Sequence, residues 1–456
     1  MPGIMKLART QAGLLAVLLA TVPALAQESA PDFWHRDTLT GDWGGIRTTL
    51  AEQGVTFTLK YTSDLQANVA GGIRRGAVYD GVFEPEIDID LDKAVGWNGA
   101  SASVSMLQIS GPSATAWYVG NLLNVSSING LPATRLYNAW LQQNAFDDVL
   151  SVRVGLMNVD AEFFTSPTAS LFVSSTFGWP GILAIDLPGG GPAYPLSAPM
   201  VRVRLQPTQD LSLMAAVFSG DPTGGNGSNS LSTLQPDGTT VSFNGGALVM
   251  AEASYAINQG KDAKGPPFAA KFGGWYHSSQ RFGDQRFDNM GLSLADPSSD
   301  AVPFNHHGDW GLYAIMDAMV YQVPGGSGAG LSAFARVASA PGDQNLISFY
   351  ADAGLTYKGL LPTRGSDLIG IAAAYARIGN RARALDLDFQ SFGLVFTPVR
   401  SEEVILELTY QAQVTGWWTM QPDLQAVFNP GGRVANANNT VRPNALVIGL
   451  RSQLTF

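Results

Sequence analysis

Charged side chains recur at every second position in several segments of this 456-residue chain. Residues 201–205 read Val-Arg-Val-Arg-Leu, residues 152–154 read Val-Arg-Val, and residues 87–92 read Ile-Asp-Ile-Asp-Leu-Asp. Successive side chains of a β-strand point to opposite faces, so each segment would carry its charges on one face and its aliphatic side chains on the other. Guanidinium and carboxylate groups that share a face can bind the hydroxyl groups of a neutral polar solute.

The same alternation identifies the strand residues that would face a shared polar surface. An alternative interpretation is that these charges form ion pairs along a polar wall and touch no solute, and for any single residue this interpretation is the stronger one. The candidate residues are Lys60, Asp88, Asp90, Arg153, Arg202, Arg204, Arg336, Glu407 and Arg451.

Residues that would indicate an enzyme are sparse. The four histidines are His35, His277, His306 and His307, and only the adjacent pair has a carboxylate close by, at Asp309. Adjacent histidines lack the i, i+4 spacing of a helical zinc site, and no nucleophile-elbow motif is present. The chain has no cysteine and therefore no disulfide or thiolate metal site. We predict no catalytic residue, no metal site and no cofactor.

The elements that must position the charged residues are β-strands. Residues 55–62 alternate almost perfectly, and the last segment, 445–456, places aliphatic residues and Phe456 on one face and polar residues on the other. A soluble sandwich would show the same alternation, but a terminal aromatic on the apolar face is what outer-membrane proteins present to their assembly machinery. Residues 51–456 allow about 25 residues for each strand and connection in a barrel of 16 strands. We therefore predict an all-β fold, a transmembrane antiparallel β-barrel over residues 55–456.

The N-terminus has the pattern of a cleavable signal peptide at residues 1–26. A basic start and an apolar stretch at 13–20 lead to the Ala-Leu-Ala sequence at 24–26. A transmembrane anchor is the alternative, but the apolar stretch is shorter than the roughly 20 residues that a helical span needs. Residues 27–54 are then a short N-terminal periplasmic segment.

One long connection, residues 161–199, separates two predicted strands. It is far longer than a hairpin needs, and such loops are usually functional. We expect it to fold inward and form the constriction of a pore; an extracellular cap is the alternative. Its Trp179 and Tyr194 are candidates for contact with the apolar face of a solute ring, although packing within the loop or a place in the interfacial aromatic belt would explain them equally well.

The bulk composition agrees with a barrel and excludes one class of partner. Hydrophobic residues make up 45%, close to a soluble average, as expected when lipid-facing apolar residues alternate with polar residues of the lumen, the interior of the barrel. The formal charge of −10 argues against nucleic acid, since a phosphate backbone requires a basic face. The expected partners are outer-membrane lipids and the outer-membrane assembly machinery.

Several short strings, in order along the chain, resemble the carbohydrate-selective porin family of the OprB type. They include LTGDWGGIR at 39–47, YVGNL at 118–122, GPAYP at 191–195, QPDLQ at 421–425 and NPGG at 429–432. Each string is weak alone, but their order and their span over nearly the whole mature chain make the match specific. The resemblance implies a passive, sugar-preferring channel of 16 strands with a periplasmic N-terminal segment.

We therefore expect a porin of the bacterial outer membrane that lets carbohydrates, monosaccharides such as glucose, diffuse into the periplasm, and we expect no enzyme activity. For passage by diffusion, the channel wall must replace the water around the solute at low cost. It must also bind the solute weakly enough to release it. A general or ion-selective porin on the same barrel is one alternative, and a secreted all-β glycan-binding protein or glycosidase is another. Monomer and homo-oligomer both remain open.

Overall fold

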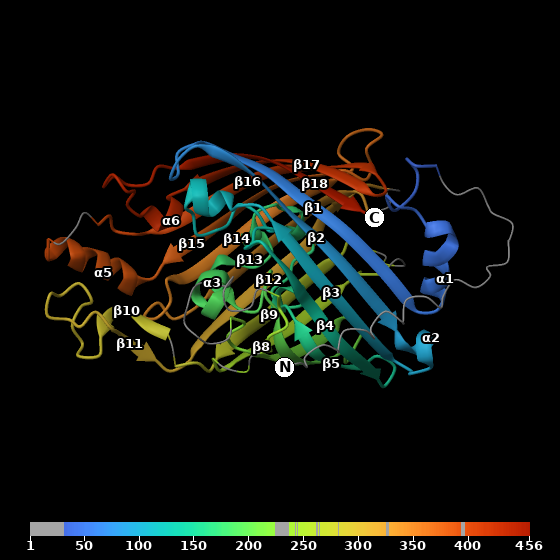
Figure 1. Ribbon diagram of the computed structural model, residues 1–456, viewed down its shortest axis with the longest axis horizontal. Coiled ribbons are helices and arrows are strands. Elements are labelled where there is room, and N and C mark those ends of the chain that lie inside the picture. The colour runs from blue at the N-terminus through green and yellow to red at the C-terminus, as the bar shows by residue number, and fades with distance from the viewer. Residues whose placement is uncertain are drawn as a thin grey trace, which may run out of the picture.

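The computed structural model describes residues 32–223, 237–241, 243, 245–260, 263, 265–280, 282–324, 328–393 and 397–456. The predicted signal peptide lies outside the described residues. The described chain forms a closed antiparallel barrel of sixteen strands, which confirms the predicted fold (Figure 1). A separate two-stranded sheet lies outside the ring of strands.

The bounds of the barrel strands follow the chain in two halves. The first half contributes β1 (Val55–Ala70), β2 (Gly76–Asp90), β3 (Ala100–Ser110), β4 (Ala133–Ala145), β5 (Leu150–Met157), β6 (Ala198–Leu205), β7 (Leu211–Ser219), β8 (Ala247–Ile257) and β9 (Phe268–His277). The second half contributes β12 (Asp309–Gln322), β13 (Gly330–Ser339), β14 (Ile347–Lys358), β15 (Leu368–Ile378), β16 (Glu402–Thr415), β17 (Trp418–Phe428) and β18 (Ala445–Thr455).

The first and last strands close the ring. β1 pairs with β18 in antiparallel register, with Lys60 opposite Thr455 and Asp64 opposite Arg451. Every other barrel strand pairs with its neighbours in sequence, except that β9 pairs directly with β12. Because each strand is paired on both sides, no sheet edge is exposed to the bilayer.

The two faces of the strands are reversed relative to a soluble protein. On β18, Ile448 and Leu450 are exposed on the outer surface, whereas Val447 is fully buried and Arg451 points into the lumen. On β1, the apolar Leu65 is exposed and the polar Gln66 is buried. An apolar exterior with a polar interior is what a lipid environment requires, and a soluble sandwich would show the opposite arrangement.

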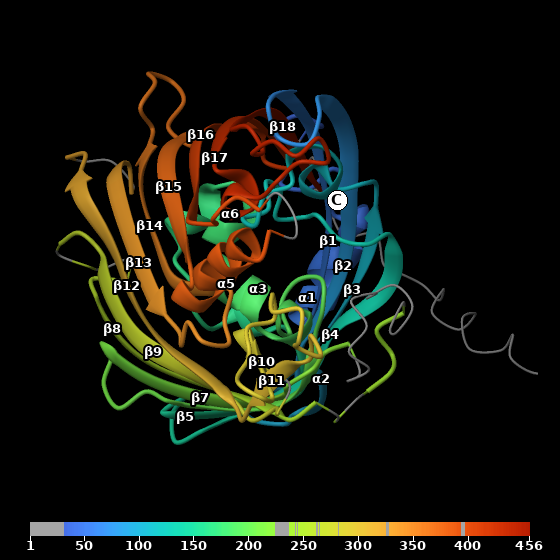
Figure 2. The same cartoon turned by 90° about the vertical axis from the view of Figure 1, so that its left-hand side faces the viewer.

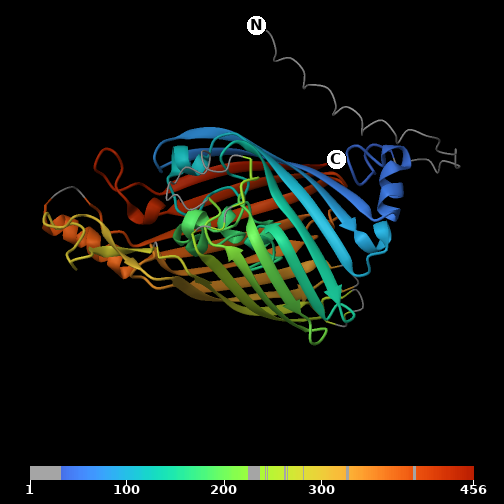
Figure 3. The same ribbon diagram turned by 60° about the horizontal axis from the view of Figure 1, so that its bottom comes forward.

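The two ends of the barrel differ in the length of their connections. At the end that carries Phe456, the connections are short, and this end also carries two short helices, α1 (Ile46–Glu52) and α2 (Leu91–Val95) (Figures 1 and 3). We call it the turn end, and it corresponds to the periplasmic side of outer-membrane barrels. The sequence segment 87–92 does not continue as a strand, because β2 ends at Asp90 and α2 begins.

The opposite end, here called the loop end, carries the long connections. The connection from β9 to β12 forms the small sheet of β10 (Phe282–Asp288) and β11 (Pro303–His306), and α5 (Asn380–Ser391) precedes β16. Seen from the loop end, these elements lie across the mouth of the barrel (Figure 2). Among the described residues, no helix is both long and apolar enough to span a membrane.

An arginine introduced on β18 should have opposite effects on the two faces of the strand. Ile448→Arg places a charge on the lipid-facing surface, so we expect a loss of about 2–4 kcal/mol in the free energy of unfolding near the bilayer midplane. Gln453→Arg, on the lumen face, should fold almost normally. Urea titration of the barrels folded into vesicles measures both, and equal losses would contradict the assignment of the two faces.

The C-terminal residue contributes to closure of the barrel. The backbone N–H of Phe456 donates to the carbonyl of Leu59 at 2.8 Å, and its ring packs edge-on against Phe83 with centroids 6.1 Å apart. We expect deletion of Phe456 to lower the fraction of detergent-resistant barrel on unheated gels, whereas Phe456→Tyr should preserve it. Assembly of the truncated chain at the wild-type level would show that this residue has no part in assembly.

Candidate channel constriction

The connection between β5 and β6 lies inside the barrel. Residues 158–197 carry a short helix, α3 (Gly181–Asp186), which lies within the ring of strands in Figure 2. Phe163 and Phe164 are no more than 1% exposed, and Phe164 stacks on Tyr313 of β12 with ring centroids 4.2 Å apart. The inner wall of the barrel therefore carries an apolar surface that binds this segment, in addition to its polar residues.

Arg336 of β13 binds the backbone of this segment. Its guanidinium is fully buried and pairs with Asp352 of β14 at 2.5 Å. Its remaining N–H groups donate to the carbonyls of Phe164, Thr176 and Gly178 at 3.2, 2.8 and 3.1 Å. A guanidinium with these partners has no free donor aimed at a solute. The prediction that Arg336 lines the channel is corrected, since Arg336 anchors the inserted segment.

Carboxylates on neighbouring strands bind other parts of the same segment. Glu407 of β16 accepts hydrogen bonds from the backbone N–H groups of Val173 and Ser174 at 2.6 and 3.0 Å. Asp317 of β12 accepts from the N–H of Thr168 at 3.1 Å. Each carboxyl group supplies acceptors for backbone N–H groups of the inserted segment. The buried Glu407 is thus an anchor, which corrects its predicted place on the channel surface.

A second connection, residues 111–132 between β3 and β4, also packs against the inner wall. Glu403 of β16 accepts from the backbone N–H groups of Leu122 and Leu123 at 2.8 and 2.7 Å. Sequence analysis did not identify this segment as functional. Its length was the available signal, because 22 residues are more than a hairpin needs.

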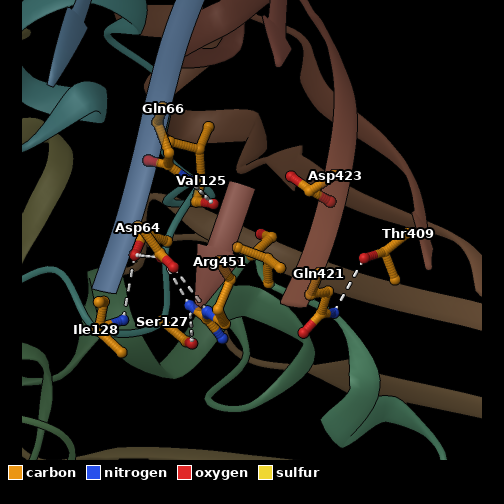
Figure 4. A network of polar contacts seen from close by, with 12 residues as sticks. Asp64, Gln66, Val125, Ser127, Ile128, Thr409, Gln421, Asp423 and Arg451 are labelled. Carbon is orange, nitrogen blue, oxygen red and sulfur yellow. Dashed lines mark hydrogen bonds and ion pairs between the residues drawn. The ribbon is translucent and has the colours of Figure 1, made fainter. Parts of the chain in front are cut away.

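Arg451 holds this second segment through the seam of the barrel (Figure 4). Its guanidinium pairs with Asp64 of β1 through two contacts of 2.8 Å and donates to the hydroxyl of Ser127 at 3.0 Å. Beside it, Gln66 donates to the carbonyl of Val125 at 2.8 Å. Arg451 was predicted to line the channel, but its charged group is occupied by contacts that fix residues 111–132 to the wall.

Three of the candidate arginines lie on the strands that flank the first inserted segment, and two of them share one carboxylate. Arg202 binds Glu162 through two N–H groups at 2.9 and 2.8 Å and also donates to Gln142. Arg153 lies 3.3 Å from Glu162 and 3.8 Å above the ring of Trp140. Glu162 was not among the residues predicted from the sequence, because it belongs to the irregular segment. Its position beside strands that carry three arginines was the available signal.

Exposure separates the members of this cluster. The side chain of Arg202 is 1% exposed, whereas those of Arg153 and Glu162 are 14% and 19% exposed. Arg204, two residues along β6 on the same face as Arg202, is half-buried. The three candidate arginines thus belong to a mixed cluster, in which Arg202 fixes Glu162 while Arg153, Glu162 and Arg204 keep part of their surface open.

The other candidates on the strands lie toward the turn end. Lys60 pairs with Glu84 at 3.0 Å, and Asp88 is half-buried. Asp90 caps α2, since its carboxylate accepts from the backbone N–H groups of Asp92 and Lys93 at 3.1 and 3.2 Å. Both Asp88 and Asp90 line a hollow of about 360 Å³. The carboxylate of Asp90 therefore stabilises a helix terminus, which sequence alternation alone did not predict.

The two candidate aromatics pack within the inserted segments. Trp179 is only 8% exposed, and its indole N–H donates to the carbonyl of Gly190 at 2.9 Å. The hydroxyl of Tyr194 donates to the carbonyl of Ile128 at 2.7 Å, and its ring lies edge-on to Tyr137. Trp179 therefore offers no free ring face to a solute, which corrects that expectation. Tyr194 joins the two inserted segments to each other.

The histidines have structural partners. His277 is buried with one ring nitrogen 2.9 Å from the carbonyl of Gly220, and the other accepts from the N–H of Ser279 at 3.2 Å. His306 lies 2.9 Å from Asp284. Among the described residues, no group of three or more His, Cys, Asp or Glu side chains is arranged to hold a metal ion.

Relatives share this architecture over nearly the full chain. Porin B of Pseudomonas aeruginosa is 27% identical over 448 residues, which cover 92% of this chain and 91% of the relative. The putative porin QuiX of Acinetobacter baylyi is 22% identical, with 97% and 99% coverage. The high-pH structure of Pseudomonas putida OprB superposes with a TM-score of 0.82 at 26% identity and covers 93% of this chain and 100% of that one.

The low-pH structure of the same Pseudomonas putida protein gives a TM-score of 0.57 at 21% identity. The model of the family described as "Carbohydrate-selective porin, OprB family" matches residues 74–456. Fold and family both indicate a channel rather than an enzyme. The chain belongs to the carbohydrate-selective porin, OprB family, and is a porin of the bacterial outer membrane.

Proposed function

We propose that this porin conducts neutral monosaccharides, such as glucose, by passive diffusion past a constriction at Arg153, Glu162 and Arg204. The observation that carries the proposal is the pairing of a partly exposed carboxylate, Glu162, with the partly exposed guanidinium of Arg153 inside the barrel, with the half-buried Arg204 on the adjacent strand. A sugar hydroxyl both donates and accepts hydrogen bonds. It can therefore donate to the carboxylate and accept from the guanidinium, and these two hydrogen bonds replace those it made with water. Partial burial keeps the contacts few and the binding weak enough for release.

The inserted segments 111–132 and 158–197 support the size limit in this proposal. Each is held to the inner wall by hydrogen bonds from buried side chains, so each removes part of the cross-section of the barrel from the solute path. Breaking such a contact would leave a buried polar group without a partner, which is costly. A fixed constriction would admit a small ring and hinder longer oligosaccharides, whereas a mobile loop would select poorly.

The partner and topology assignments are part of the same proposal. Lipids of the outer membrane would contact the apolar exterior, and the assembly machinery would receive the strand that ends in Phe456. Residues 27–54 would lie in the periplasm after removal of residues 1–26. Whether barrels associate as a homo-oligomer is answered by their mass in detergent.

Removing arginines from the constriction tests the proposed function. We expect Arg153→Ala with Arg204→Ala to weaken the block of ion current by glucose and to shift ion selectivity toward cations, since two positive charges leave the solute path while Glu162 remains. Planar-bilayer recordings measure both quantities. A matched variant, Arg75→Ala with Arg433→Ala, removes the same charge from exposed positions at the loop end and should leave glucose block unchanged. A wild-type channel that no sugar blocks would identify a general porin instead.

Loosening an anchor tests whether the inserted segment narrows the path. Glu407→Gln replaces one of the two acceptor oxygens with an NH2 group, which would face a backbone N–H and leave it without its partner, at a cost of about 1–3 kcal/mol. We expect a higher and noisier single-channel conductance. Glu86→Gln is the control, because the hydrogen bond that Glu86 accepts among the described residues comes from Ser103 of β3 and not from an inserted segment. An unchanged conductance in Glu407→Gln would place the narrowest point elsewhere.

A further inference from the structure

The loop end of the barrel carries a hollow that the constriction does not use. It is an open depression of about 470 Å³ between β10, the turn that follows it, β11 and α5. Sites for small organic ligands typically enclose about 300–1,000 Å³. Seen from the loop end, the elements that form the hollow lie in front of α3 and the lumen (Figure 2). A solute that approaches from outside therefore meets this hollow before it reaches the inserted segments.

Aromatic rings and planar polar groups line the hollow. Phe304 is 44% exposed, and Phe287 is half-buried on the neighbouring strand. The side chain of Asn289 is exposed, and that of Arg381 is 37% exposed. Aromatic rings pack against apolar C–H faces, and amide and guanidinium groups bind hydroxyls. Together they match a pyranose, which has apolar ring faces and a hydroxyl rim.

A buried carboxylate, that of Asp284, connects β10, β11 and α5 beneath the hollow. Asp284 accepts from the backbone N–H groups of Arg286 and Phe287, both at 2.9 Å. The same carboxylate lies 2.9 Å from His306 and contacts the guanidinium of Arg381. Its side chain is 1% exposed, so these contacts are shielded from water. Asp284 thus ties the backbone at Phe287 and the side chains of His306 and Arg381 together before any ligand arrives.

A second carboxylate joins α5 to β10. Asp388 binds the guanidinium of Arg286 through contacts of 2.8 and 3.0 Å and accepts from the hydroxyl of Ser293 at 2.6 Å. The Arg286 guanidinium holds the pKa of Asp388 below its ordinary value, so the pair stays ionised near neutral pH. Because these contacts already hold the elements around the hollow, binding of a ligand there would cost little conformational entropy.

We propose that this hollow is an outer docking site for a monosaccharide, which would be held there weakly before it passes to the constriction. The inference rests on the proposed function, because the ligand chemistry is that of the conducted solute. A weak site at the mouth raises the local concentration of solute on one side of the membrane only. Its effect is therefore on the rate of entry from the loop end.

The test is the rate at which glucose blocks single channels of known orientation. Glucose is added to the loop-end compartment or to the turn-end compartment, and the association rate is taken from current noise. Phe304→Ala should lower the association rate from the loop end by about two- to tenfold, as expected for one lost aromatic contact. Asn289→Ala, an exposed substitution that leaves the barrel intact, should lower it in the same direction. Neither variant should change conductance or the rate from the turn end.

Phe392→Ala is the matched control, because Phe392 is an exposed ring at the end of α5 that does not line the hollow. It should behave as wild type from both sides. Wild-type block with no change in Phe304→Ala and Asn289→Ala would overturn the docking site alone. An equal loss from both sides would also overturn it, since that result indicates a disturbed constriction. Absence of glucose block in the wild type would overturn the proposed function and this inference with it.

Discussion

Backbone N–H and C=O groups in hydrocarbon must find partners within the protein, and the rest of this structure depends on that constraint. Sixteen strands meet it only by closing into a ring through β1 and β18. Closure gives every strand one face toward lipid and one toward the lumen, so polar residues gather inside. The charged residues of the interior can then bind the inserted segments or a solute.

Those interior charges divide into two groups according to burial. Arg336, Glu407 and Arg451 bind backbone groups or side chains of the inserted segments. Arg153 and Glu162 keep part of their surface open. The deeply buried groups fix the shape of the passage, and the partly exposed groups determine its chemistry. A wide barrel can contain a narrow passage because side chains of its wall bind the chain segments that fill its interior.

Period-two alternation predicted the strands, because it follows from the geometry of a membrane-spanning strand. The number of strands was implied by the family resemblance, and the chain length was consistent with it. Alternation also assigned Arg336 correctly to the inner face. It could not show that Arg336 is buried under another segment, since such contacts join residues far apart in sequence. Glu162 and the cap at Asp90 were missed for a related reason. Both depend on local backbone paths that have no periodic signal.

The seam between β1 and β18 also determines when the fold can exist. The ion pair between Asp64 and Arg451 joins residues 387 positions apart, so it cannot form until both β1 and β18 have been synthesised. A chain without β18 would have two unpaired strand edges, one on β1 and one on β17. Such a sheet cannot rest in hydrocarbon. A chain that lacked β18 would therefore have no stable place in the bilayer, which makes the pairing of β1 with β18 a condition for insertion.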